Sequence, residues 1–193
     1  SNNEKLRRLY ARFNQLTEID VSQNPLLELF WIEGNQISYI DVSNSGNLKI
    51  LLARENNLTS VDFSNNPILE RIDLSDNSLS EIDVSQNFNL FEINVGRNNL
   101  TEIDFSNNSE MVRIDLYNNQ IDDIDLTANL KLRDLYIEDN LLSNLDLSQN
   151  AALERLIIEN NSFSQIDITQ NSKIFDLQIG GNQFMAAELD QMI

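Results

Sequence analysis

The sequence contains no cysteine and no histidine, and it is poor in proline, glycine and basic residues. Without cysteine it has no disulfide, thiolate nucleophile or zinc–thiolate site, and without histidine it lacks the commonest general base and imidazole ligand. Only 13 Lys and Arg oppose 31 Asp and Glu, for a net charge of −18. That balance argues against binding to nucleic acid or an anionic membrane. We therefore expect a protein that is not an enzyme and that carries no cofactor and no metal site.

Long hydrophobic runs are also missing. No apolar segment approaches the ~20 residues that span a bilayer, so we expect no membrane insertion. The sequence begins with Ser and shows no signal-peptide segment, which indicates a trimmed or processed chain. In contrast, 41% of its 193 residues are hydrophobic, which at this length predicts one domain with a substantial core.

The dominant feature that is present is a repeat of 21 residues without a single insertion. Its unit reads LxxLxIxxNxLxxIDVSxNxx. An apolar pair one residue apart, such as Phe30 and Ile32, is typical of a short strand with one buried face. One unit cannot bury that face alone, whereas nine stacked units form a continuous core. The Asn that marks each repeat stands at Asn14, Asn35, Asn56, Asn77, Asn98, Asn119, Asn140, Asn161 and Asn182.

The two halves of each unit carry the same apolar pattern and leave no room for a helix. We therefore predict a β-rich solenoid of one domain, 1–193, with short parallel strands on both sides of a flattened coil. Residues 1–13 form either a helical cap or a degenerate first repeat, because Leu6, Leu9 and Phe13 fit both spacings. Residues 183–193 are expected to form a capping helix, cut short by the end of the sequence.

The string Leu69xxIle72xLeu74xxAsn77xLeu79 resembles the core motif of the leucine-rich repeat family, LxxLxLxxNxL. The longer string LxxLxLxxNxLxxLDLSxN is similar to the nested 21-residue class found in secreted and surface proteins of Bacteroidetes-type bacteria. The match extends over about residues 6 to 189. This resemblance implies a ligand-binding or adhesion scaffold that is secreted or lies on the cell surface.

One half of the repeat is monotonous and acidic. Its outward position is always Asp, and the eleven residues after each repeat Asn contain thirteen acids and no base in the eight full copies. We interpret each Asp as an acceptor for the Ser or Thr two residues later; the alternative is a row of calcium ions in a structural spacer. The column comprises Asp20, Asp41, Asp62, Asp83, Asp104, Asp125, Asp146 and Asp167.

The other half differs from copy to copy, as a recognition surface would. Large apolar side chains gather near the first repeats, and a second group lies further along. Such exposed patches, with Arg nearby, favour protein binding by a monomer or weak homo-oligomer. Packing against a preceding domain and stacking on sugar rings are the alternatives. The predicted contact residues are Tyr10, Leu29, Trp31, Ile50, Leu52, Arg54, Asp73, Arg113, Asp115, Tyr117, Tyr136 and Ile157.

Overall fold

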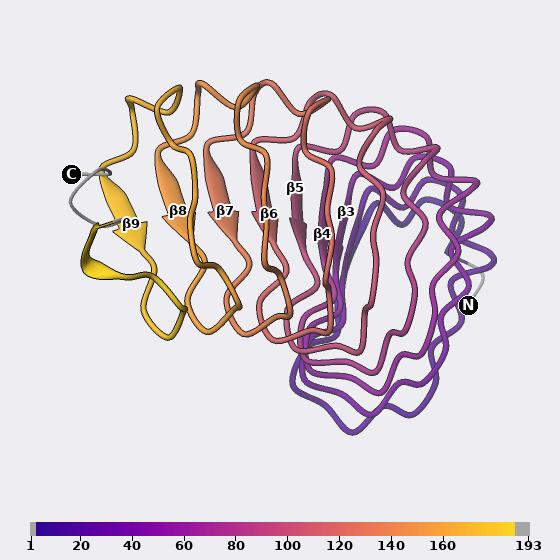
Figure 1. The fold of residues 1–193 in the computed structure, drawn as a ribbon. Coiled ribbons are helices and arrows are strands. Elements are labelled where there is room, and N and C mark those ends of the chain that lie inside the picture. The colour runs from indigo at the N-terminus through magenta and orange to yellow at the C-terminus, as the bar shows by residue number, and fades with distance from the viewer. Residues whose placement is uncertain (1–2, 188–193) are drawn as a thin grey trace.

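A three-residue strand recurs once in every 21-residue repeat of the computed structural model, which describes residues 3–187 (Figure 1). The strands pair in parallel and in chain order, in a single nine-stranded sheet within this range. Each residue pairs with the one 21 positions later, as Phe30 does with Leu51. The predicted β-solenoid is confirmed. Its strands are β1 (Arg8–Tyr10), β2 (Leu29–Trp31), β3 (Ile50–Leu52), β4 (Arg71–Asp73), β5 (Glu92–Asn94), β6 (Arg113–Asp115), β7 (Asp134–Tyr136), β8 (Arg155–Ile157) and β9 (Asp176–Gln178).

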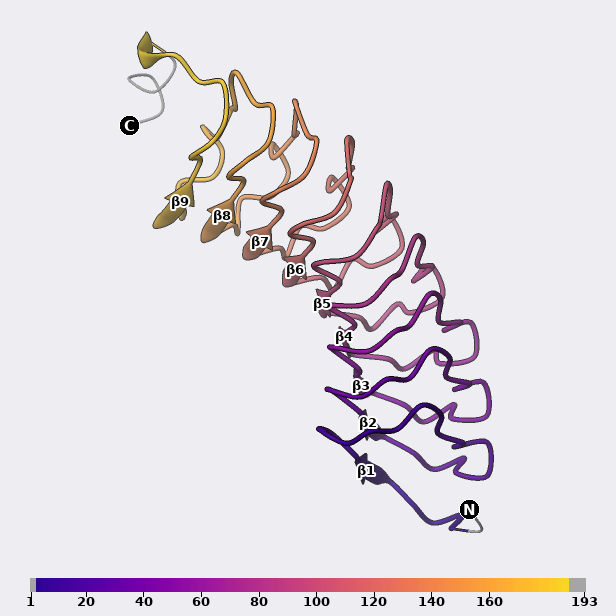
Figure 2. The same cartoon turned by 90° about the horizontal axis from the view of Figure 1, so that it is seen from below.

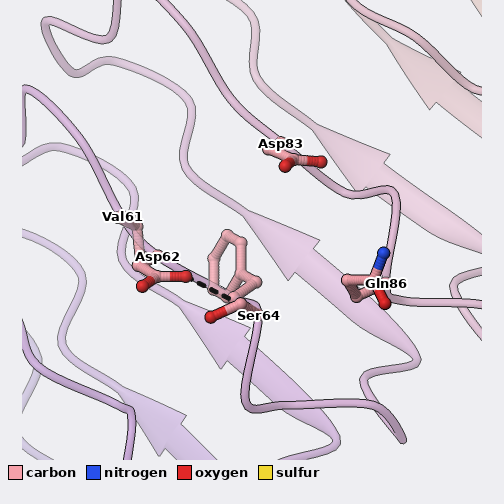
Figure 3. Close-up of a pocket in the computed structure, with 6 residues that line it drawn as sticks. Val61, Asp62, Ser64, Asp83 and Gln86 are labelled. Atoms are coloured by element: carbon pink, nitrogen blue, oxygen red, sulfur yellow. Dashed lines mark hydrogen bonds between the residues drawn. The ribbon is translucent and has the colours of Figure 1, made fainter.

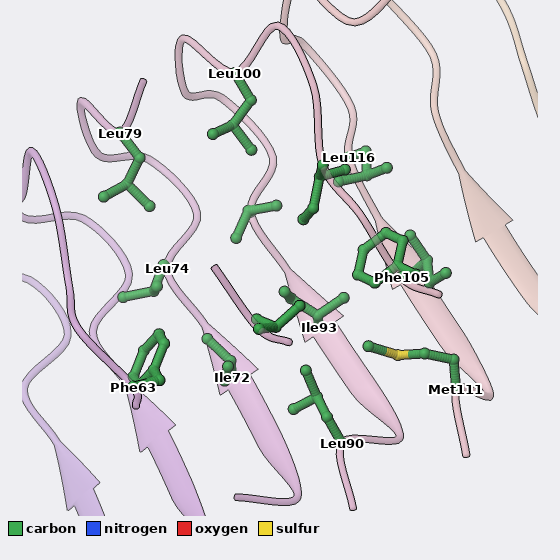
Figure 4. Packing of buried hydrophobic residues seen from close by; sticks show 14 of the residues in the cluster. Phe63, Ile72, Leu74, Leu79, Leu90, Ile93, Leu100, Phe105, Met111 and Leu116 are labelled. Carbon is green, nitrogen blue, oxygen red and sulfur yellow. The ribbon is translucent and has the colours of Figure 1, made fainter. Parts of the chain in front are cut away.

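The core is one continuous column of apolar side chains along the solenoid. The middle residue of each strand points inward, and Phe30, Leu51 and Ile72 are fully buried. Figure 4 shows strand residues such as Ile72 in the same interior as Phe63, which comes from the other half of its repeat. Every coil therefore contributes side chains from both halves to the same core, and no coil can bury them without its neighbours.

The second half of each repeat differs from the prediction of strands on both sides. Segments such as 40–42 are extended but form no strand pairing anywhere within residues 3–187. Figure 2 shows that the strands follow the inner, concave side of a curved solenoid and that these segments follow the outer side. Curvature spreads the outer backbone beyond the ~4.8 Å at which strands pair. In this half of the repeat, one backbone hydrogen bond per coil still joins neighbouring coils. An example is the bond from the Asn57 amide to the Ile37 carbonyl at 2.9 Å.

The repeat Asn residues form what we call the first asparagine ladder. In the Asn98 example, Oδ1 accepts the Leu79 amide of the preceding coil at 2.9 Å. Nδ2 donates to the carbonyls of Leu74 at 3.0 Å and Val95 at 2.9 Å. One buried side chain thus satisfies backbone groups in two coils where the strand pairing has ended. This is why the repeat requires Asn at this position.

The second asparagine ladder lies on the opposite turn and includes Asn66 and Asn87. The Asn87 Nδ2 donates to the carbonyls of Phe63 at 3.2 Å and Asn66 at 2.9 Å. Its Oδ1 is buried and accepts no hydrogen bond. Ser45 occupies this ladder in the second coil, and its buried hydroxyl also has no partner. The two ladders therefore look alike in the sequence but differ in the backbone groups that depend on them.

The two ends of the solenoid differ in structure. Residues Arg8–Tyr10 form strand β1 and pair with β2 in the register of a first repeat, so these residues do not form a helix. At the other end, residues 183–185 of the predicted cap over 183–193 are not helical, Ala186 and Ala187 are helical, and the part of that cap beyond Ala187 lies outside the described residues. Within residues 3–187 no helix has the length and apolarity needed to cross a membrane.

Candidate functional site

The concave face of the sheet presents two outward columns because strand residues alternate between core and solvent. The first residue of every strand lines one column and the third residue lines the other. A third column, two residues beyond the strands, holds Arg12, Glu33, Arg54, Ser75, Gly96 and Tyr117. Because the register is constant at 21 residues, equivalent positions in adjacent coils are direct neighbours. The face is therefore a grid whose side chains differ from coil to coil.

Strands β1, β2 and β3 bring five of the predicted contact residues together. Leu29 pairs with Ile50 and Trp31 pairs with Leu52 in the register of β2 and β3. The ring centres of Tyr10 and Trp31 lie 5.8 Å apart. We call this group the N-terminal apolar cluster, and its members are Tyr10, Leu29, Trp31, Ile50 and Leu52.

Two polar neighbours hold the Trp31 ring in place. Its Nε1 donates to Glu33 Oε2 at 2.9 Å, and the Arg12 guanidinium lies 4.2 Å from the ring centre. Tyr10 is 55% exposed and Trp31 is partly exposed, so the rings are oriented but still accessible. The prediction missed Arg12 and Glu33. The sequence could have identified Arg12 and Glu33 as site residues, because they stand in the same repeat column as the predicted contact residue Arg54.

Tyr117 and Tyr136 form a second group further along the face. The Arg113 guanidinium lies 4.6 Å from the centre of the Tyr136 ring. Tyr117 lies over Gly96, where an added Cβ would come within 2.3 Å of the ring. Burial raises the pKa of Tyr117. Gly96 is thus a site residue that the prediction missed. It could have been found from the sequence, because a glycine stands directly before a tyrosine in the same repeat column.

Two predicted contact residues are not accessible. Asp115 and Ile157 are only 4% and 5% exposed, so neither offers surface to a partner. Asp115 Oδ2 accepts from Arg113 Nε at 3.0 Å, whereas its buried Oδ1 accepts no hydrogen bond. Burial raises the pKa of Asp115 to about 6, against the opposing effect of Arg113. Both residues stand at the third, outward position of their strands, as the sequence pattern predicts, but they are buried there.

The remaining predicted residues, Arg54 and Asp73, are partly exposed. Arg54 Nε pairs with Asp76 Oδ2 at 3.2 Å. Asp73 Oδ1 accepts from the Ser75 amide at 3.1 Å and from its hydroxyl at 2.7 Å. Arg54 and Asp73 therefore present charged groups that already have partners within the chain.

The aspartates of the outer face have the partners that the sequence predicted. In all eight, Oδ1 accepts the amide of the Ser or Thr two residues later at 2.7–2.9 Å. At Asp41 the hydroxyl and amide of Ser43 lower the pKa of the carboxyl. Within the described part of the chain, no three acidic side chains are grouped closely enough to hold a metal ion. The turn-acceptor interpretation of this column is confirmed.

A hollow on the outer face lies between two of these turns, as Figure 3 shows. It measures about 40 Å³ and is lined by Asp62, Ser64, Asp83 and Gln86, together with Val61 and Phe63. Substrate pockets usually occupy ~300 Å³ or more. A larger groove of about 620 Å³ runs beside it, lined by acids such as Glu81, Glu102 and Asp104. Its ionisable groups are all carboxylates in similar surroundings, so nothing separates an acid from a base.

Solved structures resemble this chain over most of its length. The functional domain of InlJ from Listeria monocytogenes matches 92% of the chain with a TM-score of 0.90 and 34% identity, and this chain spans 40% of that one. Internalin C2 from the same species matches 91% with a TM-score of 0.80 and 21% identity, over 81% of its own chain. A leucine-rich repeat protein of Leptospira interrogans matches 98% with a TM-score of 0.69 and 16% identity, over 70% of its own chain.

The last two likenesses concern the fold alone because their identities are low. No protein-family profile matches the chain, and neither does any curated protein. The InlJ domain includes a cysteine ladder, whereas this chain has no cysteine and stacks asparagines between its coils. The 21-residue coils, the parallel sheet and these structural neighbours together show that the chain is a leucine-rich repeat protein built from 21-residue repeats.

Proposed function

We propose that this chain is a non-catalytic recognition module that binds a protein partner through its concave face. The observation that carries the proposal is the N-terminal apolar cluster, where Tyr10 is exposed and four further large side chains stay partly exposed on the sheet. Aromatic groups that are already oriented bury much area at little cost in rotamer entropy. In the same coils the outer half exposes a single aromatic side chain, Tyr39, and otherwise repeats one acidic turn. Partner-specific contacts are therefore better supported on the concave side.

The structural neighbours support the coarser part of this proposal, since they are leucine-rich repeat proteins and several are internalins. We further infer a secreted or cell-surface location and a role in adhesion, as the repeat class implies. Glycan binding at the exposed Tyr10 and Trp31 rings is the second candidate, because sugar rings stack on aromatic side chains. Both candidates use the same surface and are separated by the chemistry of the ligand.

A protein array and a glycan array, probed with the same labelled chain, test the proposal. We expect reproducible signals on extracellular proteins that disappear when Trp31→Ser and Leu52→Ser are combined. A matched control on the outer face, Glu81→Ser with Glu102→Ser, should keep those signals. Signals confined to the glycan array would favour the second candidate. Protein signals lost in the outer-face control and retained in the concave variant would refute the proposal.

A further inference from the structure

The arginines of the concave face differ in whether they have an acidic partner. Further along the solenoid, Arg71 pairs with Glu92 at 3.1 Å and Arg155 with Asp134 at 2.8 Å. Arg54, Arg97 and Arg113 also form ion pairs. Arg8 and Arg12 are both exposed and have no ion-pair partner within residues 3–187.

These two arginines lie on either side of the N-terminal apolar cluster. Arg8 pairs in register with Leu29, and Arg12 lies over the Trp31 ring. The acid next to Arg12 in its column, Glu33, accepts the indole N–H of Trp31 instead. Two cationic groups therefore border an apolar surface without forming an ion pair within the described part of the chain. An arginine held against an aromatic ring keeps its N–H groups free for a carboxylate.

We propose that the occupant of this cluster is an acidic segment of a protein partner, with a carboxylate beside a large apolar side chain. This inference rests on the proposed function and specifies the partner's chemistry. The apolar side chain packs on Trp31, Leu29 and Leu52, and the carboxylate accepts hydrogen bonds from Arg8 or Arg12. Arginine binds carboxylates through two parallel N–H groups, which adds geometric selectivity.

The charge distribution of the whole chain adds to this selectivity. At a net charge of −18, the acidic outer face attracts basic segments without distinguishing among them, and it repels acidic ones. An acidic segment therefore finds an attractive site where cations are left unpaired. Selectivity for acidic segments then combines attraction at this one site with repulsion elsewhere on the surface.

Trp31 is the only tryptophan of the sequence, so its fluorescence reports directly on this cluster. The probe is a phage-displayed library of random dodecapeptides panned on the wild-type chain. Selected tryptophan-free peptides are then titrated while the Trp31 emission is followed. We expect an enriched pattern of Asp or Glu next to Phe, Leu or Tyr, and a blue shift on binding.

Charge reversal then tests the two arginines. Arg8→Glu and Arg12→Glu should each weaken the selected peptides about tenfold or more, as for the loss of a charged hydrogen bond. Lys173→Glu is the matched control, because Lys173 is exposed at the far end and has no ion-pair partner in the described range; it should leave affinity within twofold. Unchanged thermal melting of each variant confirms that the fold is intact.

The outcomes separate this inference from the proposed function. Peptides without acids, or affinities unchanged in both arginine variants, would overturn the acidic-partner inference. The proposed function would still stand if those peptides failed to bind the Trp31→Ser, Leu52→Ser variant. Peptides that bind that variant as well as wild type would contradict both. Anionic sugars that bind in an Arg8- and Arg12-dependent way, with no acidic peptide selected, would also overturn the inference.

Discussion

Truncation of one asparagine from each ladder should have unequal costs, although the two residues occupy equivalent-looking positions in the repeat. Asn98→Ala removes the Oδ1 that accepts the Leu79 amide. No other acceptor is available to that amide, and Leu79 is fully buried. The carbonyls of Leu74 and Val95 keep a second donor in the neighbouring Asn77 and Asn119. The specific damage is therefore one buried, unsatisfied N–H group.

Asn87→Ala does not create such a group. The Phe63 and Asn66 carbonyls keep the backbone amides of Asn66 and Leu69, at 3.0 and 3.1 Å. The deletion also removes an Oδ1 that is buried without a partner. Both changes remove the same atoms, so their cavity contributions are similar.

The magnitudes follow from these differences. Each Nδ2 hydrogen bond that is lost costs ~1 kcal/mol, the buried Leu79 amide left unsatisfied costs about 1–3 kcal/mol, and removal of the unpaired Asn87 Oδ1 offsets part of the loss at that residue. We therefore expect Asn98→Ala to lower the free energy of unfolding by about 3–5 kcal/mol and Asn87→Ala by about 1–2 kcal/mol. Urea unfolding followed by circular dichroism measures both, and the exposed Asn99→Ala serves as the control. Equal losses for Asn98 and Asn87, or a larger loss for Asn87, would refute the reasoning.

Four further predictions concern other features of the coils. Ser45→Asn should raise the free energy of unfolding by about 1–2 kcal/mol, because an amide at this position completes the second asparagine ladder; a loss in urea midpoint would contradict it. Gly96→Ala should cost about 1–2 kcal/mol by displacing the Tyr117 ring. The same change should cost almost nothing in a Tyr117→Ala background, and a double-mutant cycle without coupling would exclude this contact. The pKa of Asp115 is raised to about 6, so the native state binds that proton more tightly than the unfolded chain does. Stability should therefore rise by about 1 kcal/mol from pH 7 to pH 5, and Asp115→Asn should abolish that part of the rise in thermal melts. Below about pH 4 stability should fall instead, because the pKa of Asp41 and most of its column is lowered and protonation removes those turn contacts. A melting temperature that continues to rise below pH 3 would contradict this last expectation.

Much of the fold was predictable because the repeat encodes it locally. The 21-residue period predicts the parallel register, and the apolar pair around each strand predicts which side chains enter the core. The outer Asp followed by Ser or Thr predicts its own turn, since donor and acceptor are two residues apart. These features depend on short distances along the chain, and every copy of the repeat supplies them again.

The candidate site was predictable only in outline. The variable columns identify the concave face, and the first repeats bring the five members of the N-terminal apolar cluster together as expected. Accessibility within those columns was not predictable, because it depends on neighbours 21 residues away. Asp115 and Ile157 are buried although they stand at outward positions, and Gly96 leaves room for the Tyr117 ring of the next coil.

The sequence by itself determined the solenoid, its period, its core and the contrast between a constant acidic face and a variable one. Tertiary structure decided three further things: which half of the repeat pairs into a sheet, which outward residues remain exposed, and which arginines lack an acid. The physical reason is the curvature of the stack. It brings backbone and side chains together on the inner side and separates them on the outer side, so contacts between coils cannot be inferred from one repeat alone.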